Sequence, residues 1–192
     1  MIPYINPKWR MEQHPAEIEG FVAFAREFLQ SERPEAVLEL GVRHGGTSAL
    51  WHEVFHGALV IGVDRVGVDS YQEPEFTQRA LEMEAEFPRY HFVAGDTGDL
   101  NTFLHVSRVL DGREVSLLFI DADHSYEGVS RDYGLYLPFV ETGGLIAFHD
   151  IVDTPYTGGG VTRFWNEVKQ RHNHHWEFCI HGDWGGIGVV QK

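Results

Sequence analysis

The sequence lacks the features that mark secreted and membrane proteins. It contains one cysteine, Cys179, so the chain cannot form an internal disulfide. No apolar run approaches the ~20 residues that a membrane-spanning helix needs. The N-terminus also lacks the basic-then-apolar pattern of a signal peptide. We therefore expect a cytoplasmic protein with no membrane partner.

Basic residues are also scarce. Lys and Arg number 15 against 29 Asp and Glu, which gives a formal net charge of −14. An acidic protein repels the phosphates of nucleic acids, so we expect no nucleic-acid partner, whereas the same field favours cations. With 192 residues, of which 43% are hydrophobic, the chain fits a single folded domain over residues 1–192.

Apolar residues follow the period of a strand in some segments and that of a helix in others. Short apolar runs predict seven strands, at residues 36–40, 58–64, 90–96, 115–123, 145–150, 176–180 and 187–191. Helical spacing predicts helices around 18–29, 50–55, 73–87, 100–106, 129–136 and 161–168. Apolar strands that alternate with helices are buried on both faces, as in a parallel sheet. We predict a doubly wound, Rossmann-like α/β fold with a seven-stranded, mostly parallel sheet and a C-terminal antiparallel hairpin.

The first strand leads into a glycine-containing loop, ELGVRHGGT (39–47). In doubly wound folds ligands bind at the carboxyl ends of the strands, so this loop is a candidate site. Arg43 stands where a dinucleotide-binding loop needs its second glycine, which disfavours NAD and FAD, and no Walker sequence occurs. Glycines allow the backbone to bend tightly and a ligand to approach it. The candidate residues are Glu39, Gly41, Gly45, Gly46 and Thr47.

Acids also end the next two strands. Asp64 ends the second strand, where a carboxylate can accept both hydroxyls of a ribose. Asp96, followed by Thr97, ends the third strand, where it can accept an adenine amino group. A single acid at the end of a strand caps a helix or lies in a turn about as often as it binds a ligand. Together, on consecutive strands, these residues predict a pocket for an adenosine without phosphates.

Two segments carry a resemblance to a known family. FIDADHSYEGVSRD (119–132) and TGGLIAFHD (142–150) resemble the signature FIDGDHSYEG…AFHD. This signature belongs to a small branch of the class I S-adenosylmethionine (SAM)-dependent methyltransferases. The resemblance covers nearly the whole chain, with Ala122 in place of a common Gly and Glu39 in place of a common Asp. It implies that Glu39 and the loop glycines hold the methionine part of SAM, Asp64 the ribose and Asp96 the adenine.

The acids Asp121 and Asp150 end the fourth and fifth strands, so their oxygens can converge on one cation. Metal-dependent O-methyltransferases of the catechol and macrolide-sugar types bind their cation here, and the resemblance implies Asp121 and Asp150 as ligands. We add His149 as the third candidate ligand. Those relatives often have an acid where this chain has His149, and imidazole suits Mn²⁺, Fe²⁺ or Zn²⁺ better than Mg²⁺. We expect Mg²⁺ or Mn²⁺, with the identity left open. The alternative is that both acids cap turns or pair with Arg131.

His124 lies three residues after Asp121 on the same loop. A histidine with a near-neutral pKa can take the proton of an acceptor hydroxyl, which lets the oxygen attack a methyl carbon. We therefore assign His124 and Asp121 as catalytic, and place Asp121 at the edge of the SAM pocket as well. The alternatives for His124 are a cap of the following helix and a third metal ligand.

These residues leave three functions open. The first is an O-methyltransferase for a small hydroxylated acceptor, such as a sugar or a natural product. The second is a metal-dependent hydroxylase or hydrolase on the same fold, and the third is a SAM-binding module without turnover. The N-terminal helical segment, residues 1–34, covers the cofactor in some relatives and is a candidate lid. The compact chain leaves the acceptor site open, so a homodimer is one way to close it.

Overall fold

The helices and strands alternate along the chain as the apolar periods predict. The computed structural model describes residues 8–11, 13–29, 34–65, 74–153, 158–180 and 185–192. The strands are β1 (Ala36–Leu40), β2 (Leu59–Asp64), β3 (Tyr90–Ala94), β4 (Val115–Ile120), β5 (Val140–His149), β6 (His175–Phe178) and β7 (Ile187–Gln191). The α-helices are α1 (Pro15–Leu29), α2 (Gly46–Val54), α3 (Pro74–Glu86), α4 (Leu100–Leu110), α5 (Tyr126–Tyr136) and α6 (Gly160–Val168). Short 3₁₀ helices follow α5 and α6, at Leu137–Phe139 and Lys169–Arg171.

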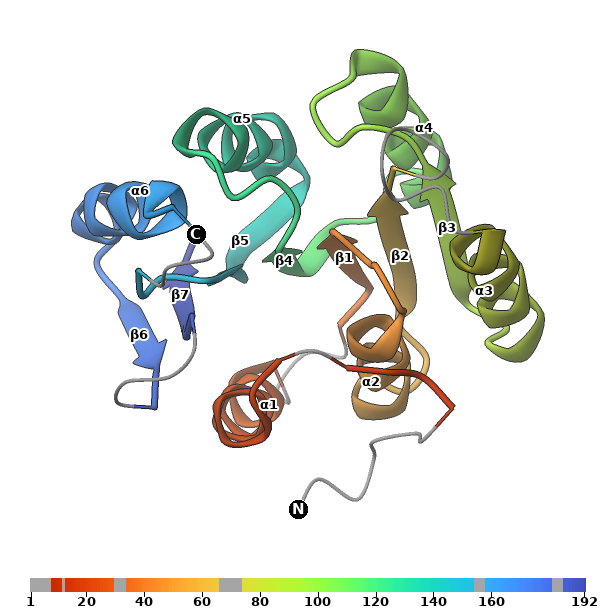
Figure 1. Cartoon of the computed structure of the whole chain (residues 1–192), viewed down its shortest axis with the longest axis horizontal. Coiled ribbons are helices and arrows are strands. Elements are labelled where there is room, and N and C mark those ends of the chain that lie inside the picture. Colours follow the sequence, from red (N-terminus) through yellow and green to blue (C-terminus); the bar gives the residue numbers. More distant parts are fainter. Residues whose placement is uncertain (1–7, 12, 30–33, 66–73, 154–157, 181–184) are drawn as a thin grey trace.

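All seven strands form one sheet, in the order β3-β2-β1-β4-β5-β7-β6 (Figure 1). β1 to β5 are parallel, and β7 pairs antiparallel with both β5 and β6. The predicted doubly wound sheet with its C-terminal antiparallel hairpin is therefore confirmed. Among the described residues, no helix has the length and apolar character needed to cross a membrane.

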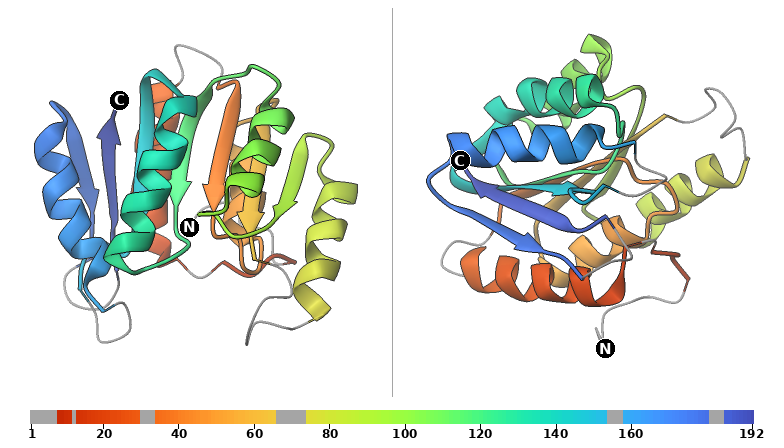
Figure 2. Two further views of the ribbon diagram at one scale, coloured as in Figure 1. Left: turned by 90° about the horizontal axis from the view of Figure 1, so that it is seen from above. Right: turned by 60° about the vertical axis from the view of Figure 1, so that its left-hand side comes forward.

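Helices cover both faces of the sheet (Figure 2), and an apolar cluster lies between the helices and the sheet on each face. Alternate strand residues face opposite sides, so Leu117 and Phe119 of β4 join one cluster while Leu118 and Ile120 join the other. The first cluster packs under α1, α2 and the end of α3, and the second under α4, α5 and α6. Because both faces are covered, the carboxyl edge of the central strands is the part of the sheet left for a ligand.

The fifth strand begins earlier than the sequence predicts. The sequence predicts this strand over residues 145–150, but β5 starts at Val140 and includes Gly143 and Gly144. Gly143 has φ +91°, and the register against β4 shifts between the Val115–Val140 and Leu117–Leu145 pairs. The amide of Gly143 donates to the Lys192 carbonyl at 3.0 Å. The two glycines therefore form an irregularity inside a hydrogen-bonded strand, which the end of the chain holds in place.

Asp132 on α5 is a fully buried acid away from the strand ends. Its Oδ2 accepts a hydrogen bond from Thr97 Oγ1 at 2.9 Å, while Oδ1 has no hydrogen-bond partner among the described residues. The Arg131 Nε lies 3.8 Å from Oδ1. Burial raises the pKa of Asp132 to about 6, against the lowering effect of the Thr97 hydrogen bond.

We expect Asp132→Asn to stabilise the protein at pH 7.5 and not at pH 4. A raised pKa means that this carboxyl favours folding fully only below its unfolded pKa, and that the benefit is lost as the pH rises through about 6. The loss amounts to about 2–3 kcal/mol for a shift of this size. Urea unfolding at both pH values measures it. Asp99→Asn, at the exposed N-cap of α4, is the control, and equal stability differences at the two pH values would contradict the expectation.

Candidate functional site

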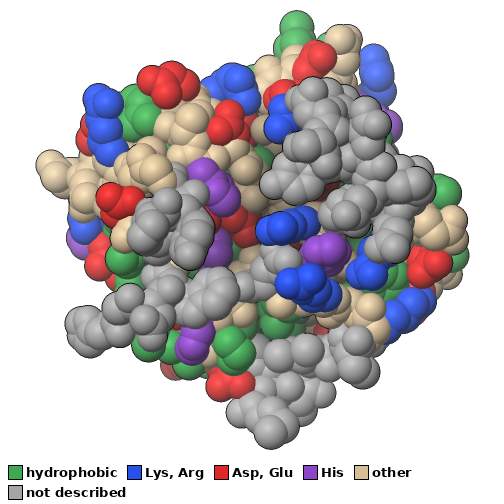
Figure 3. Space-filling view, viewed as in Figure 1, with side chains coloured by type: hydrophobic (Ala, Val, Ile, Leu, Met, Phe, Trp, Pro, Cys, Tyr) green, Lys and Arg blue, Asp and Glu red, His purple; other side chains and the backbone are tan. Residues whose placement is uncertain are grey.

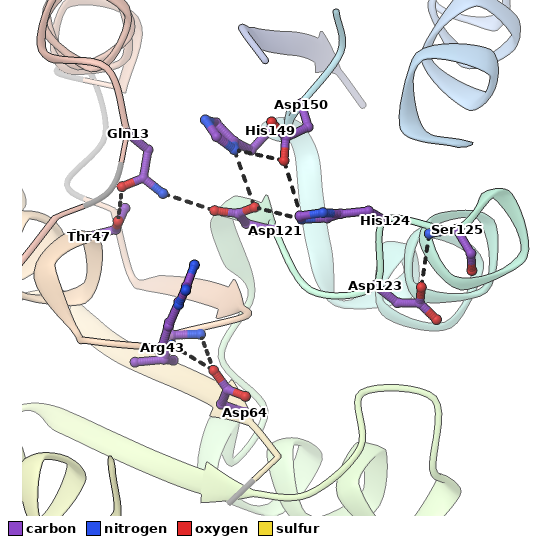
Figure 4. A network of polar contacts seen from close by, with 11 residues as sticks. Gln13, Arg43, Thr47, Asp64, Asp121, Asp123, His124, Ser125, His149 and Asp150 are labelled. Carbon is purple, nitrogen blue, oxygen red and sulfur yellow. Dashed lines mark hydrogen bonds and ion pairs between the residues drawn. The ribbon is translucent and has the colours of Figure 1, made fainter. Parts of the chain in front are cut away.

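The loop after β1 is held by the acid at the end of β2. Asp64 Oδ2 accepts hydrogen bonds from the amides of Val42 at 2.8 Å and Arg43 at 2.6 Å. The second oxygen of Asp64 points away from the loop (Figure 4). Arg43 has φ +48°, an uncommon conformation for a residue other than glycine. One carboxylate oxygen therefore fixes the loop, and the other can accept a hydrogen bond from a ligand.

The glycines of this loop are needed for packing inside the protein. Gly41 and Gly45 have φ values of +92° and +79°. A Cβ at any of the three glycines would collide with protein atoms: the Asp121 carbonyl at Gly41, the Met83 sulfur at Gly45 and the Arg10 carbonyl at Gly46. The loop thus touches the end of β4 directly, and the N-terminal segment crosses the start of α2. The loop follows β1, as the sequence predicts, and its glycines have a steric role within the fold.

Glu39 lies beneath the loop and is 1% exposed. Ser48 Oγ donates a hydrogen bond to its Oε2 at 2.5 Å. Burial raises the pKa of Glu39 well above its usual range, and the negative charges of Asp121 and Asp64 add to that rise, whereas the Ser48 hydrogen bond opposes it. A positive group nearby would favour its ionised form.

The residues after β3 diverge. Asp96 accepts a hydrogen bond from the Gly98 amide at 2.8 Å and stays half exposed, with Arg65 at 3.7 Å and Arg131 at 3.6 Å. The hydroxyl of Thr97 is buried and donates to Asp132, so it faces the interior. The Thr97 carbonyl also faces the interior, where it accepts a hydrogen bond from the Tyr136 hydroxyl at 2.9 Å. Asp96 therefore lies at the carboxyl edge of the sheet, whereas Thr97 is tied to α5.

Four side chains meet at the ends of β4 and β5. Asp121 Oδ1 lies 3.5 Å from His124 Nε2 and 3.3 Å from His149 Nδ1. Asp150 Oδ2 lies 3.3 Å from the same His124 atom and 3.4 Å from the same His149 atom. Two carboxylates and two imidazoles thus form a closed ring of contacts (Figure 4). Figure 3 shows histidine and acidic side chains together near the middle of this face, with Lys and Arg side chains beside them.

The charges in this cluster shift one another's pKa values. Burial opposes ionisation of Asp121, but His149 and His124 outweigh it and lower the Asp121 pKa far below its usual range. Burial also disfavours a charged His149, which is 8% exposed, yet the two carboxylates raise its pKa well above the usual range. The pKa of His124 rises chiefly because of its contact with Asp121. The cluster therefore stabilises positive charge between its two acids.

The spacing of these donors fits a metal ion. All four N···O distances are 3.3–3.5 Å, longer than the ~2.7–3.2 Å of a good N–H···O bond. Ligands about 2.1 Å from a tetrahedral metal are about 3.4 Å apart. Asp121, His124 and Asp150 each offer a ligand atom within 4.8 Å of the others. Nitrogen donors favour Mn²⁺, Fe²⁺, Co²⁺ or Zn²⁺ over Mg²⁺.

The backbone around Asp150 is specialised. Asp150 has φ +61°, in the left-handed region that Asp tolerates better than most residues. A Cβ on Gly185 would collide with the Asp150 carboxylate, so the residues before β7 pack closely on this acid. Neither Asp121 nor Asp150 pairs with Arg131 in the described part of the chain, because Arg131 instead faces Asp96 and Asp132. The alternative in which the two acids pair with Arg131 is therefore disfavoured.

His124 does not cap the helix that follows it. The N-cap of α5 is Ser125, whose hydroxyl accepts a hydrogen bond from the Gly128 amide at 3.0 Å. The side chain of His124 is 41% exposed, against 16% for Asp121 and 11% for Asp150. His124 is therefore the member of the cluster that is most open to an incoming molecule.

Gln13 belongs to the site although no motif contains it. Its Nε2 donates to Asp121 Oδ2 at 2.9 Å, and its Oε1 accepts from Thr47 Oγ1 at 2.7 Å. The sequence indicates only that Gln13 precedes α1 within the candidate lid segment, residues 1–34. Of that segment, residues 1–7, 12 and 30–33 lie outside the described residues.

Solved structures with a similar fold include O-methyltransferases. TomG of Streptomyces achromogenes, solved with SAM, matches with TM-score 0.66 and 14% identity over 96% of this chain and 82% of that chain. An O-methyltransferase of Bacillus cereus, solved with S-adenosylhomocysteine (SAH), matches with TM-score 0.64 and 16% identity over 98% of this chain and 84% of that chain. The methyltransferase MycE, in complex with Mg, SAH and mycinamycin VI, matches with TM-score 0.61 and 17% identity over 98% of this chain and 52% of that chain. At these identities the likeness shows the fold.

Two sequence comparisons are more direct. A protein of Acanthamoeba polyphaga mimivirus is 27% identical over 116 residues, which are 60% of this chain and 51% of that protein. The chain thus spans about half the length of this curated relative. A family model described as a methyltransferase domain matches residues 38–151, from β1 to the end of β5, which is more than half of the chain. The chain therefore belongs to this methyltransferase-domain family.

Proposed function

We propose that the protein transfers a methyl group from SAM to a hydroxyl of a small acceptor, with the help of a divalent cation. The observation that carries this proposal is the contact between the loop after β1 and the Asp/His cluster at the ends of β4 and β5. Gly41, in the loop that would hold the methyl donor, packs against the backbone of Asp121, whose carboxylate belongs to the Asp/His cluster. A methyl donor and a cation-bound hydroxyl would therefore lie side by side, as methyl transfer requires.

The methyl donor would lie along the ends of β1, β2 and β3. The second oxygen of Asp64 would accept the ribose hydroxyls, and Asp96 the adenine amino group. Glu39, Gly41, Gly45, Gly46 and Thr47 would form the wall at the methionine part, with Asp121 at its edge, and Thr97 would lie beside Asp96 at the adenine end. The buried Glu39 supports this arrangement, because a positively charged amino or sulfonium group nearby would offset the cost of its ionisation.

The cation would be held by Asp121, Asp150 and His149. The cation would orient the acceptor and lower the pKa of its hydroxyl. The structure supports these ligands through the convergence of Asp121 Oδ1, Asp150 Oδ2 and His149 Nδ1. His149 supplies nitrogen where oxygen-only sites suit Mg²⁺, so Mn²⁺ or another first-row ion is the better match.

His124 would act as the general base. It takes the proton of the acceptor hydroxyl, and the oxygen then bonds to the methyl carbon as the carbon–sulfur bond breaks. Its side-chain exposure of 41% supports this role. The two acids raise the pKa of His124, and a bound cation would offset their charge and favour the neutral imidazole that a base needs.

We further propose one domain over residues 1–192, a small hydroxylated acceptor such as a sugar, and a homodimer that closes the acceptor side.

Asp64→Asn tests the methyl-donor site. We expect wild-type protein to bind SAM in calorimetry and the variant to bind at least about tenfold more weakly, since a charge-assisted hydrogen bond is worth ~1.5–3 kcal/mol. Asp99→Asn, at the exposed N-cap of α4, should bind as wild type does. Binding of NADH without binding of SAM by the wild type would overturn the proposed function.

His149→Asp tests the metal ligands. The variant replaces nitrogen by oxygen, so its affinity for Co²⁺ should fall and its affinity for Mg²⁺ should rise relative to wild type. Titration of metal-stripped protein, followed by the visible absorption of Co²⁺ and by calorimetry for Mg²⁺, measures both. The exposed His105→Asp on α4 is the matched control. An unchanged ratio of the two affinities would remove His149 from the ligand set.

His124→Ala tests the base. A general base contributes typically ~10²–10⁴-fold to the rate, so SAH release with a mixture of catechols, phenolic acids and sugars should fall by about that factor. The affinities for SAM and Co²⁺ should stay within a few-fold of wild type. A large loss of Co²⁺ affinity would instead make His124 a metal ligand, and an unchanged rate would remove it from the chemistry.

A further inference from the structure

Gln13 is a nearly buried amide that joins the two halves of the site. It is 9% exposed, and it bridges Thr47, at the start of α2, to Asp121, at the end of β4. We infer that Gln13 is a positioning residue for the metal site: it sets the orientation of the Asp121 carboxylate and thereby the affinity for the cation. This inference rests on the metal part of the proposed function.

The direction of the two hydrogen bonds fixes the orientation of the amide. An ionised carboxylate only accepts hydrogen bonds, so the Gln13 atom that faces Asp121 must be the NH₂ group. The oxygen of Gln13 then faces Thr47, whose hydroxyl donates to it. Thr47 therefore acts on Asp121 only through Gln13, as one link in a chain of three groups.

The bridge leaves the other oxygen of Asp121 for the cluster. Gln13 contacts Oδ2 at 2.9 Å, whereas the two imidazoles face Oδ1. A carboxylate held on one oxygen cannot rotate freely, so Oδ1 stays directed at His149 and His124. Groups that orient a metal ligand in this way typically change metal affinity by about 10–100-fold when they are removed.

The segment that carries Gln13 is anchored on both sides. Before it, Trp9 is 3% exposed and packs against Phe87 with ring centroids 6.2 Å apart, and the Arg10 carbonyl lies against Gly46. After it, the His14 carbonyl accepts hydrogen bonds from two amides of the first turn of α1. Gln13 is thus placed by the fold, so a substitution there can change the bridge without detaching the segment.

Gln13→Met tests the inference, because Met has a similar length and cannot hydrogen-bond through an amide. Metal-stripped protein is titrated with Co²⁺, without methyl donor or acceptor, and visible absorption gives the affinity. We expect about a tenfold or greater loss for Gln13→Met and a smaller loss for Thr47→Val. The double variant should be no weaker than Gln13→Met alone, because Thr47 acts through Gln13.

Gln78→Met on the exposed face of α3 is the matched control, since within the described parts of the chain its amide donates to Glu82, one turn away. It should bind Co²⁺ as wild type does, and thermal unfolding should show that all variants are folded. Equal Co²⁺ affinities of wild type and Gln13→Met, or additive losses in the double variant, would overturn the inference alone. A wild type that binds no Co²⁺ would overturn both the inference and the metal part of the proposed function.

Discussion

The site depends on two carboxylates of like charge that adjacent parallel strands force together. Asp121 follows β4 and Asp150 follows β5, and the parallel pairing of these strands, whose last pair is Ile120 with Phe148, places the two acids at neighbouring strand ends. Like charges in a partly buried place repel each other strongly. His149 and His124 lie between them and offset that repulsion when they are protonated. The fold therefore maintains a place where a positive charge is required, and a metal ion meets that requirement without a proton.

The same constraint links the cluster to the loop after β1. The strand order reverses between β1 and β4, and in doubly wound folds ligands bind at the carboxyl ends of the strands beside such a reversal. The Asp121 amide donates to the Leu40 carbonyl at 2.8 Å, and the missing side chain of Gly41 lets the two turns touch. Asp64 then fixes the loop from the other side. A change in any of these contacts would displace both halves of the site, and the close approach of the two turns explains why glycine is needed at position 41.

The sequence predicts those parts of the site that follow from strand ends. Apolar runs locate the strands, and parallel pairing then places Asp64, Asp121 and Asp150 on one edge. The sequence is less informative where a contact depends on three-dimensional packing. Thr97 lies at a strand end, yet its hydroxyl turns inward because a buried Asp132 on α5 needs a donor. Gln13 is 108 residues from Asp121 in the chain, and no periodicity or spacing relates them.

The chemical type of Gln13 fits its place beside Asp121. A lysine or arginine there would neutralise the carboxylate and compete with a metal ion for it, because a buried cation strongly favours an ionised partner. An apolar residue would leave Oδ2 without the donor that it now has. A neutral amide gives a hydrogen bond and adds no charge, so the negative charge of Asp121 stays available to the cluster on the Oδ1 side. With a neutral donor on one oxygen and two imidazoles facing the other, Asp121 directs its charge toward the cluster on the Oδ1 side, where the proposed cation would bind.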